Sequence, residues 1–296
     1  MKKINFNWMF IWLACTIWNM PAFSQSSGTD STGLPGDHFS LQGALEMFKQ
    51  SSSPEDFEKR INTEDNKVNN LDLNGDGDID YVKVISKVDG DVHVFILQVP
   101  VSENENQDIA VIELEKDGKE SAILQIIGDD DIYGEQVIVE PQEEITSPEK
   151  EGGDEMKGGG PNPFYDMDEE MAIVINVWPW PCVRFVYAPA YRPWISPWRW
   201  RHYPGWWRPW RPFSWHVWHP FHHRYHRHYP VVRTHRVVHA HRVYTPHRTA
   251  SVTVKTRHAT NLGKYRVTRT KTTKTVTGPR GNTKVKTTKT TRVKRR

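Results

Sequence analysis

The acidic side chains of this 296-residue chain are confined to its first part. All 36 Asp and Glu residues lie at or before Glu170, and no carboxylate side chain follows. Residues 25–171 carry 36 acidic and 10 basic side chains, a net charge of −26, whereas residues 172–296 carry +27. Halves of opposite charge either bind each other or direct one half to a charged partner, here an anionic one for the basic half.

Residues 1–24 have the parts of a secretory signal peptide: a positively charged start, an apolar stretch and a small-residue exit. We expect cleavage after Ser24 and export to the periplasm or the cell surface. The alternative is a lipoprotein acylated on Cys15, but the residues before Cys15 fit a lipobox poorly. No later stretch offers about 20 consecutive apolar residues, so we expect no transmembrane segment in the mature chain.

Residues 37–142, the acidic domain, have the pattern of an α+β fold. Apolar residues at helical spacing behind Ser40 predict one helix, and Ser53-Pro54 predicts the start of a second. Runs rich in β-branched residues, separated by Asp-Gly turns, predict strands. These strands span 81–88, 92–99, 109–114, 122–127 and 136–139. Because they are apolar on both faces in places, we expect two N-terminal helices to cover one side of a small, mainly antiparallel sheet.

The rest of the chain divides by composition. Residues 25–36 predict a flexible leader, and residues 143–170 an acidic, Gly-rich linker. The basic tail comprises a Trp/Pro/Arg/His-rich segment, 171–230, and a Thr/Lys/Arg-rich segment, 231–296. Frequent prolines predict extended chain in the first segment. Low apolar content predicts disorder in the second, although repeats on either side of residues 278–281 are compatible with a solvated hairpin.

Residues 72–80 read Asp-Leu-Asn-Gly-Asp-Gly-Asp-Ile-Asp. Oxygen-bearing side chains at alternate positions around a glycine suit Ca²⁺, which takes six to eight oxygen ligands. The spacing predicts a structural calcium site with the ligands Asp72, Asn74, Asp76, Asp78 and Asp80. The loop resembles calcium loops of the EF-hand, dockerin and FG-GAP types over these nine residues. Lys83 stands where an EF-hand has its bidentate Glu, so the FG-GAP-like version fits better; the alternative is a turn with solvated acids.

Tryptophan and arginine alternate in the first segment of the tail. Indole rings prefer an interface with one wet side, and guanidinium groups stack on them or pair with phosphate. Residues 197–201, Pro-Trp-Arg-Trp-Arg, resemble cationic host-defence peptides that act on anionic membranes. We predict that an anionic surface or polymer binds Arg192, Trp194, Trp198, Arg199, Trp200, Arg201, Trp206, Trp207, Arg208, Trp210 and Arg211. The alternative is an aromatic cluster that packs on itself or on the acidic domain. Export argues against nucleic acid as the normal partner.

Twelve of the 14 histidines lie in the tail. Neutral imidazoles at this density bind Zn²⁺, Cu²⁺ or Ni²⁺ weakly, and the candidate ligands are His222, His223, His226, His228, His239 and His241. Neighbouring arginines repel cations, and the tail contains no carboxylate and no second cysteine that completes a site. A dedicated transition-metal site is therefore not expected.

Enzymatic motifs are missing from the sequence. No nucleophile elbow, zinc-protease signature, P-loop or dinucleotide-binding fingerprint occurs, and Cys182, the single cysteine after the signal peptide, lies in a Pro-rich run. We expect no enzyme. Cys182 is interpreted as an inert thiol among aromatic residues, and the alternative is an intermolecular disulfide.

Four stretches carry a resemblance at the scale of the chain: residues 68–78, 92–100, 194–201 and 233–241. They are similar to a family of exported proteins of Gram-negative bacteria with an acidic domain and a Trp/His/Arg-rich tail. The resemblance implies export and this layout, and supplies no activity.

Three hypotheses for the function follow. The first is a non-enzymatic envelope protein with a calcium-stabilised domain and a tail that binds anionic surfaces or polymers. The second is a His-rich protein that buffers transition metals. The third is a structural protein that self-assembles through its oppositely charged halves.

Overall fold

The computed structural model describes residues 31–142, 175–277 and 283–295. The predicted signal peptide, most of the leader and the linker lie outside these residues. The described helices are η1 (Pro35–His38), α1 (Leu41–Gln50), α2 (Pro54–Ile61), η2 (Glu64–Asn66), α3 (Asp130–Tyr133), α4 (Pro181–Val186), α5 (Trp215–His222), α6 (Val238–Tyr244), η5 (Thr245–His247) and α7 (Val252–Lys264). The strands are β1 (Lys83–Asp89), β2 (Val92–Pro100), β3 (Asn106–Gly118), β4 (Ser121–Gly128), β5 (Val137–Val139), β6 (Val231–Val232), β7 (Tyr265–Thr277) and β8 (Thr283–Arg295).

Both predicted N-terminal helices begin where their capping residues stand. The Ser40 side chain accepts a hydrogen bond from the backbone N–H of Gly43 at 3.0 Å, and Ser53 accepts one from Asp56 at 3.2 Å. Each cap satisfies a backbone donor that the first turn of a helix leaves free. Helices α1 and α2 therefore begin at Leu41 and Pro54.

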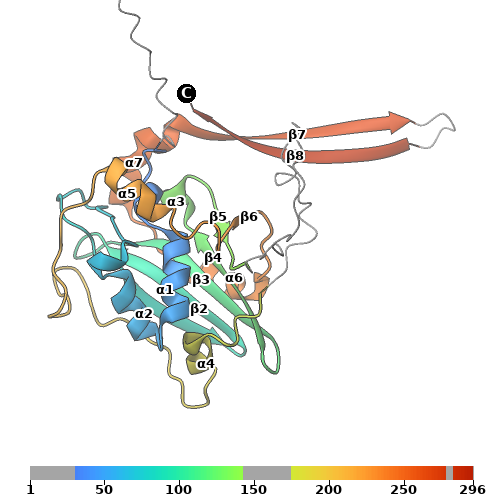
Figure 1. The fold of residues 1–296 in the computed structure, drawn as a ribbon. Helices are drawn as coiled ribbons and strands as arrows, with labels where there is room; N and C mark the ends of the chain where they lie inside the picture. The colour runs from blue at the N-terminus through green and yellow to red at the C-terminus, as the bar shows by residue number, and fades with distance from the viewer. Residues whose placement is uncertain (1–30, 143–174, 278–282, 296) are drawn as a thin grey trace, which may run out of the picture. The chain divides into compact units, whose positions relative to one another are not determined.

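Strands β1 to β6 form one antiparallel sheet in sequence order. The first five are the predicted strands, joined in pairs by tight turns such as the one that pairs Asp89 with Val92. The sixth, β6, comes from the basic tail and pairs with β5. The structure confirms the α+β class, with two N-terminal helices on a small antiparallel sheet (Figure 1).

The sheet is covered on both faces, which explains its two-sided apolar pattern. On β2, Phe95 and Leu97 belong to the core shared with α1, α2 and α4, whereas Val94 and Ile96 belong to the core shared with α6. Helices α4 and α6 both belong to the tail, so the tail supplies most of the cover of one face and part of the cover of the other.

Tail segments also cover the two edges of the sheet. At the β1 edge, Ser86 N–H donates to the Trp194 carbonyl at 2.7 Å, and Ser196 N–H donates to the Val84 carbonyl at 3.1 Å. At the β5 edge, β6 supplies the neighbouring strand. Unpaired strand edges invite intermolecular pairing, so these contacts protect the domain from edge-to-edge association.

The tail is more structured than the sequence predicts. The Trp-rich segment has extended stretches, as expected, but it contains α4 and α5 and follows the surface of the acidic domain. The segment predicted as disordered forms α6, α7 and a hairpin in which β7 pairs with β8 from Tyr265↔Arg295 to Thr277↔Thr283. Helix α6 is ordered because Val237, Ala240 and Tyr244 pack on the sheet. These contacts join residues far apart in the chain, so the local composition does not predict them.

The end of the predicted leader is also ordered. The Asp37 carboxylate accepts hydrogen bonds from the hydroxyls of Ser31 and Thr32, both at 2.7 Å, and from Gly33 N–H at 2.9 Å. Trp218 of α5 donates its indole N–H to the Asp37 carbonyl at 2.8 Å. The tail therefore fixes the start of the folded unit as well.

Candidate functional site

The predicted calcium loop lies between η2 and β1 and is closed by its own hydrogen bonds. The Asp72 carboxylate accepts the backbone N–H groups of Gly75 at 2.6 Å and Gly77 at 3.0 Å. Both glycines have positive φ, +72° and +87°, which lets the chain bend around the carboxylate. The Asn74 amide donates to Asp76 at 3.0 Å and to Asp80 at 2.9 Å. The side chains of four of the five predicted ligands are therefore engaged with the loop itself. Asp78 takes part through its backbone N–H, which donates to Asp76 at 3.0 Å, and its side chain is exposed.

Asp80 is the buried member of this loop. Burial, together with the negative charges of Asp72 and Asp76, raises the pKa of its carboxyl to about 7. No three carboxylates of the loop bring oxygen atoms within 4.8 Å of one another. The tail places a cation here: the guanidinium of Arg257 on α7 lies against Gly75. In this arrangement the oxygens do not form a cage, and calcium binding stays a prediction.

The predicted anion-binding stretch separates into exposed arginines and packed tryptophans. Arg192, Arg199, Arg201, Arg208 and Arg211, which we call the arginine row, are all exposed. None of them forms an ion pair with any carboxylate that the structure describes. The tryptophans are buried or half-buried with the exception of Trp206.

Contacts with the acidic domain hold the arginine row in place. Trp194 donates its indole N–H to the buried Glu58 carboxylate at 3.0 Å, next to the Ser196 hydroxyl at 2.9 Å. Trp207 is buried edge-on against Tyr81, with ring centroids 5.2 Å apart. The packing alternative from the sequence thus describes the tryptophans, whereas the arginines remain available for an anionic partner.

A turn brings two of the arginines outward. Arg199 and His202 exchange backbone hydrogen bonds at 3.1 and 2.8 Å, and Arg201 lies between them at φ +57°. The guanidinium of Arg201 lies over the ring of Trp200, 5.5 Å from its centroid. Stacking of this kind leaves the edge of the guanidinium free for hydrogen bonds.

Other basic residues of the tail neutralise the domain. Arg248 donates to Asp129, Asp130 and Asp131 at 2.6–2.9 Å, and Lys255 lies 3.2 Å from Asp131. The aspartate cluster is therefore a docking point for the tail. Arg236 pairs with Glu140 at 3.2 Å in the same way. The ion-paired residues and the arginine row are different parts of the tail.

The structure divides the six candidate histidines into three groups. His222, His223 and His226 come together at the C-terminal end of α5, each with one ring nitrogen within 4.8 Å of the others. His241 on α6 joins Glu113 and His235 in a second cluster. The structure leaves His228 and His239 outside both clusters.

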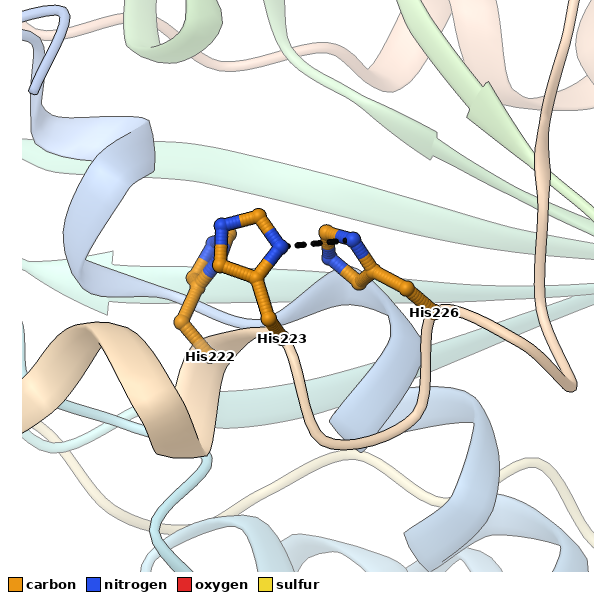
Figure 2. Close-up of side chains that lie close together, drawn as sticks. All are labelled: His222, His223 and His226. Carbon is orange, nitrogen blue, oxygen red and sulfur yellow. Dashed lines mark hydrogen bonds between the residues drawn. The ribbon is translucent and has the colours of Figure 1, made fainter. Parts of the chain in front are cut away.

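The first cluster, which we call the histidine triad, is shown in Figure 2. Nδ1 of His223 and Nδ1 of His226 face each other at 2.7 Å. Burial, together with neighbouring histidines, lowers the pKa of all three imidazoles, to about 3 for His222 and about 4 for His226. The rings are therefore neutral at pH 7.

The second cluster is built around a buried carboxylate. Glu113 of β3 accepts hydrogen bonds from His235 Nε2 and His241 Nδ1, both at 2.7 Å. The hydrogen bond to Glu113 raises the pKa of His241. Each of these nitrogens already has its partner, so the cluster is a satisfied contact between α6 and the sheet.

Sequence reasoning missed the acidic partners of the tail. It predicted no carboxylate near the histidines, because Glu113 lies more than 120 positions from His235 and His241 in the chain. It gave Glu58 no role either, although this residue accepts hydrogen bonds from Tyr81, Val84, Trp194 and Ser196. The one available signal was Glu113 itself, an acidic residue within the apolar part of a predicted strand, because a carboxylate there is costly to bury without a partner.

Cys182 lies in α4 and is fully buried in the first core. Burial raises the pKa of its thiol, so the reactive thiolate is disfavoured. This environment fits the interpretation as an inert thiol.

Comparisons with known proteins give no match: neither a protein-family model, nor a curated protein, nor a solved structure is significantly similar to this chain. None of the helices in the described residues is long and apolar enough to cross a membrane. The resemblance to exported Gram-negative proteins thus stays a prediction.

Proposed function

We propose that this chain is an exported, non-enzymatic protein of the cell envelope that binds anionic surfaces or polymers through the arginine row. The observation that carries the proposal is the separation of roles within the tail. Arg236, Arg248 and Lys255 are paired with the domain, whereas the five arginines of the row are exposed and have no described acidic partner.

The surroundings of the arginine row fit an interface with a lipid or glycolipid surface. Ile195 and Trp206 are large apolar side chains exposed to 63% and 47% within the same stretch. Apolar and aromatic side chains among arginines are typical of segments that lie at a membrane interface. The domain anchors the row through Glu58 and Tyr81, so binding does not require the segment to fold first.

The pairing of the halves within one chain bears on the self-assembly hypothesis. The ion pairs of Arg248 and Arg236 show that basic residues of the tail neutralise domain carboxylates within one chain. We therefore favour an external anionic partner over charge-driven self-assembly.

The test is cosedimentation of the full chain with vesicles that contain anionic phosphatidylglycerol, with zwitterionic vesicles as reference. Each basic residue near an anionic surface contributes about 1 kcal/mol, so R199Q/R201Q/R208Q should weaken binding about 100-fold. The matched control is R227Q/R233Q/R242Q, which changes three exposed tail arginines outside the row. Equal loss in both triple variants, or no binding of the native chain at low salt, would contradict the proposal.

A further inference from the structure

We infer that the histidine triad, His222, His223 and His226, is a binding site for a divalent transition metal that takes imidazole ligands, such as Zn²⁺. The site is separate from the arginine row and does not depend on the proposed function. It uses three of the six histidines that the sequence singled out, and the fold selects them by bringing the end of α5 and the following turn together (Figure 2).

His222 has the arrangement of a metal ligand. Its Nδ1 is buried and has no hydrogen-bond partner, while the ring forms a hydrogen bond to the backbone of Phe39. Because this hydrogen bond raises the pKa of the imidazole, the ring is the donor and the Phe39 backbone carbonyl the acceptor. Metal-binding histidines commonly donate their second ring N–H to a backbone carbonyl, which fixes the tautomer and leaves the other lone pair for the metal. A buried, unpartnered acceptor costs free energy that a metal ion would recover.

The other two rings are placed for the same ion. The 2.7 Å contact between the Nδ1 atoms of His223 and His226 satisfies one nitrogen of each ring, and Nε2 of His226 remains buried without a partner. Tetrahedral Zn²⁺ holds imidazole nitrogens at about 2.0–2.1 Å, which places two such nitrogens about 3.3 Å apart. A small rotation of the rings therefore admits the ion between them.

The candidate ligands of the triad are three imidazole nitrogens, with no carboxylate among them. Three nitrogen ligands leave a fourth position for water or another small ligand. Soft or borderline dications are favoured over Ca²⁺ and Mg²⁺, because those ions require oxygen ligands.

The cluster of Glu113, His235 and His241 differs from the triad in one respect. Both of its histidines are already hydrogen-bonded to the Glu113 carboxylate, each to one oxygen at 2.7 Å. An ion there would have to replace both of these hydrogen bonds, whereas an ion at the triad would replace one contact, between His223 and His226, and would give the unpartnered Nδ1 of His222 a partner. The same histidine-rich tail thus supplies an internal control.

The experiment is a competition for Zn²⁺ between the full chain and a chromophoric chelator at pH 7. The native chain should bind one Zn²⁺, and H223Q and H226Q should each weaken the affinity at least about 10-fold. Substitution of residues that only contact a metal ligand already causes a loss of that size. The controls H239Q, an exposed histidine of α6, and H235Q, in the Glu113 cluster, should retain the native affinity. No saturable binding by the native chain, or equal affinities of H223Q and H239Q, would overturn the inference.

Thermal unfolding separates loss of the ligand from loss of the fold. His223 is half-buried, so H223Q should melt close to the native chain in the presence of a chelator. Zn²⁺ should then raise the melting temperature of the native chain and of H239Q, but not that of H223Q/H226Q. If Zn²⁺ raised the melting temperature of the double variant as much as that of the native chain, the site would be ruled out.

Discussion

At the scale of single residues, the tail and the domain meet at buried acids. Glu58 is the clearest case: it accepts four hydrogen bonds, two from β1 and the residues before it and two from Trp194 and Ser196 of the tail. Burial raises the pKa of Glu58, yet the four donors pay most of the cost of burying it. One carboxylate thereby fixes both the start of the sheet and the segment that carries the arginine row.

The calcium loop gives the first prediction at this scale. If the loop binds Ca²⁺, rearrangement would turn the side chains of Asp72, Asp76 and Asp80 from their internal hydrogen bonds to the ion, and the buried charge of Asp80 would be compensated. Ca²⁺ should then raise the melting temperature of the native chain, and Asp76→Ala should remove that increase. Because the substitution also removes the hydrogen bond from Asn74, each variant is compared with itself in Ca²⁺ and in chelator.

Asp78 supplies the matched control, because the residue at its position in such loops ligates through the backbone carbonyl and its side chain is exposed. Asp78→Ala should keep the calcium effect. If the native chain melts at the same temperature in Ca²⁺ and in chelator, the loop is a turn held by its own hydrogen bonds, as the observed contacts with Gly75 and Gly77 already allow.

At the scale of elements, α6 illustrates what periodicity and capping predict and what they omit. Ser40, Ser53 and the Asp-Gly turns determine local structure, so α1, α2 and the hairpins follow from the sequence. The docking of α6 depends on Glu113 and on the apolar face of the sheet, which are far from it in the chain. Only the apolar character of both sheet faces hinted at a second cover, and it did not say which segment provides it.

The contact between α6 and the sheet should depend on pH. The hydrogen bond to Glu113 raises the pKa of His241 above its usual 6.5, so the protonated imidazole stabilises the folded state. This contribution is fully present below pH 6.5 and is lost as the pH rises through the raised pKa. The difference in the free energy of unfolding between the native chain and His241→Gln should therefore shrink from pH 6 to pH 9, as measured by urea denaturation.

The comparison between variants separates the contribution of His241 from that of other groups near the contact. Glu115 accepts the Ala240 N–H at 2.7 Å and Asp108 accepts the Tyr244 hydroxyl at 3.2 Å, and both remain in His241→Gln. His239→Gln, on the exposed side of the same helix, should differ from the native chain by an amount that does not change with pH. A His241→Gln difference that stays constant or grows with pH would show that the charge of His241 does not hold α6.

At the scale of the whole molecule, the opposite charges of the two halves describe only part of their association. The tail places Val177, Trp180, Cys182, Val183, Val186, Tyr229 and Val254 in the first core and Val237, Ala240 and Tyr244 in the second. The sequence showed the charge asymmetry but not this burial, because the tail residues involved are dispersed among prolines and arginines. The acidic domain and most of the tail therefore form one folding unit.

A chain that ends at Gln142 should consequently fail to form a stable domain. Burying a large apolar side chain contributes about 1.5–3 kcal/mol, and a typical domain is stable by about 5–15 kcal/mol in total. Eight of the ten are large apolar side chains, so the loss, about 12–24 kcal/mol, is as large as the whole margin, and this chain should melt at a much lower temperature and bind a fluorescent apolar dye. A chain that ends at Gly263 retains all ten and should melt close to the full chain.

Because apolar contacts are not screened by salt, 1 M NaCl should leave the full chain folded with its tail in place while it releases anionic vesicles. Unfolding or dye binding of the full chain at that salt concentration would instead make ion pairs such as Arg248 with Asp129 the main force that holds the halves together.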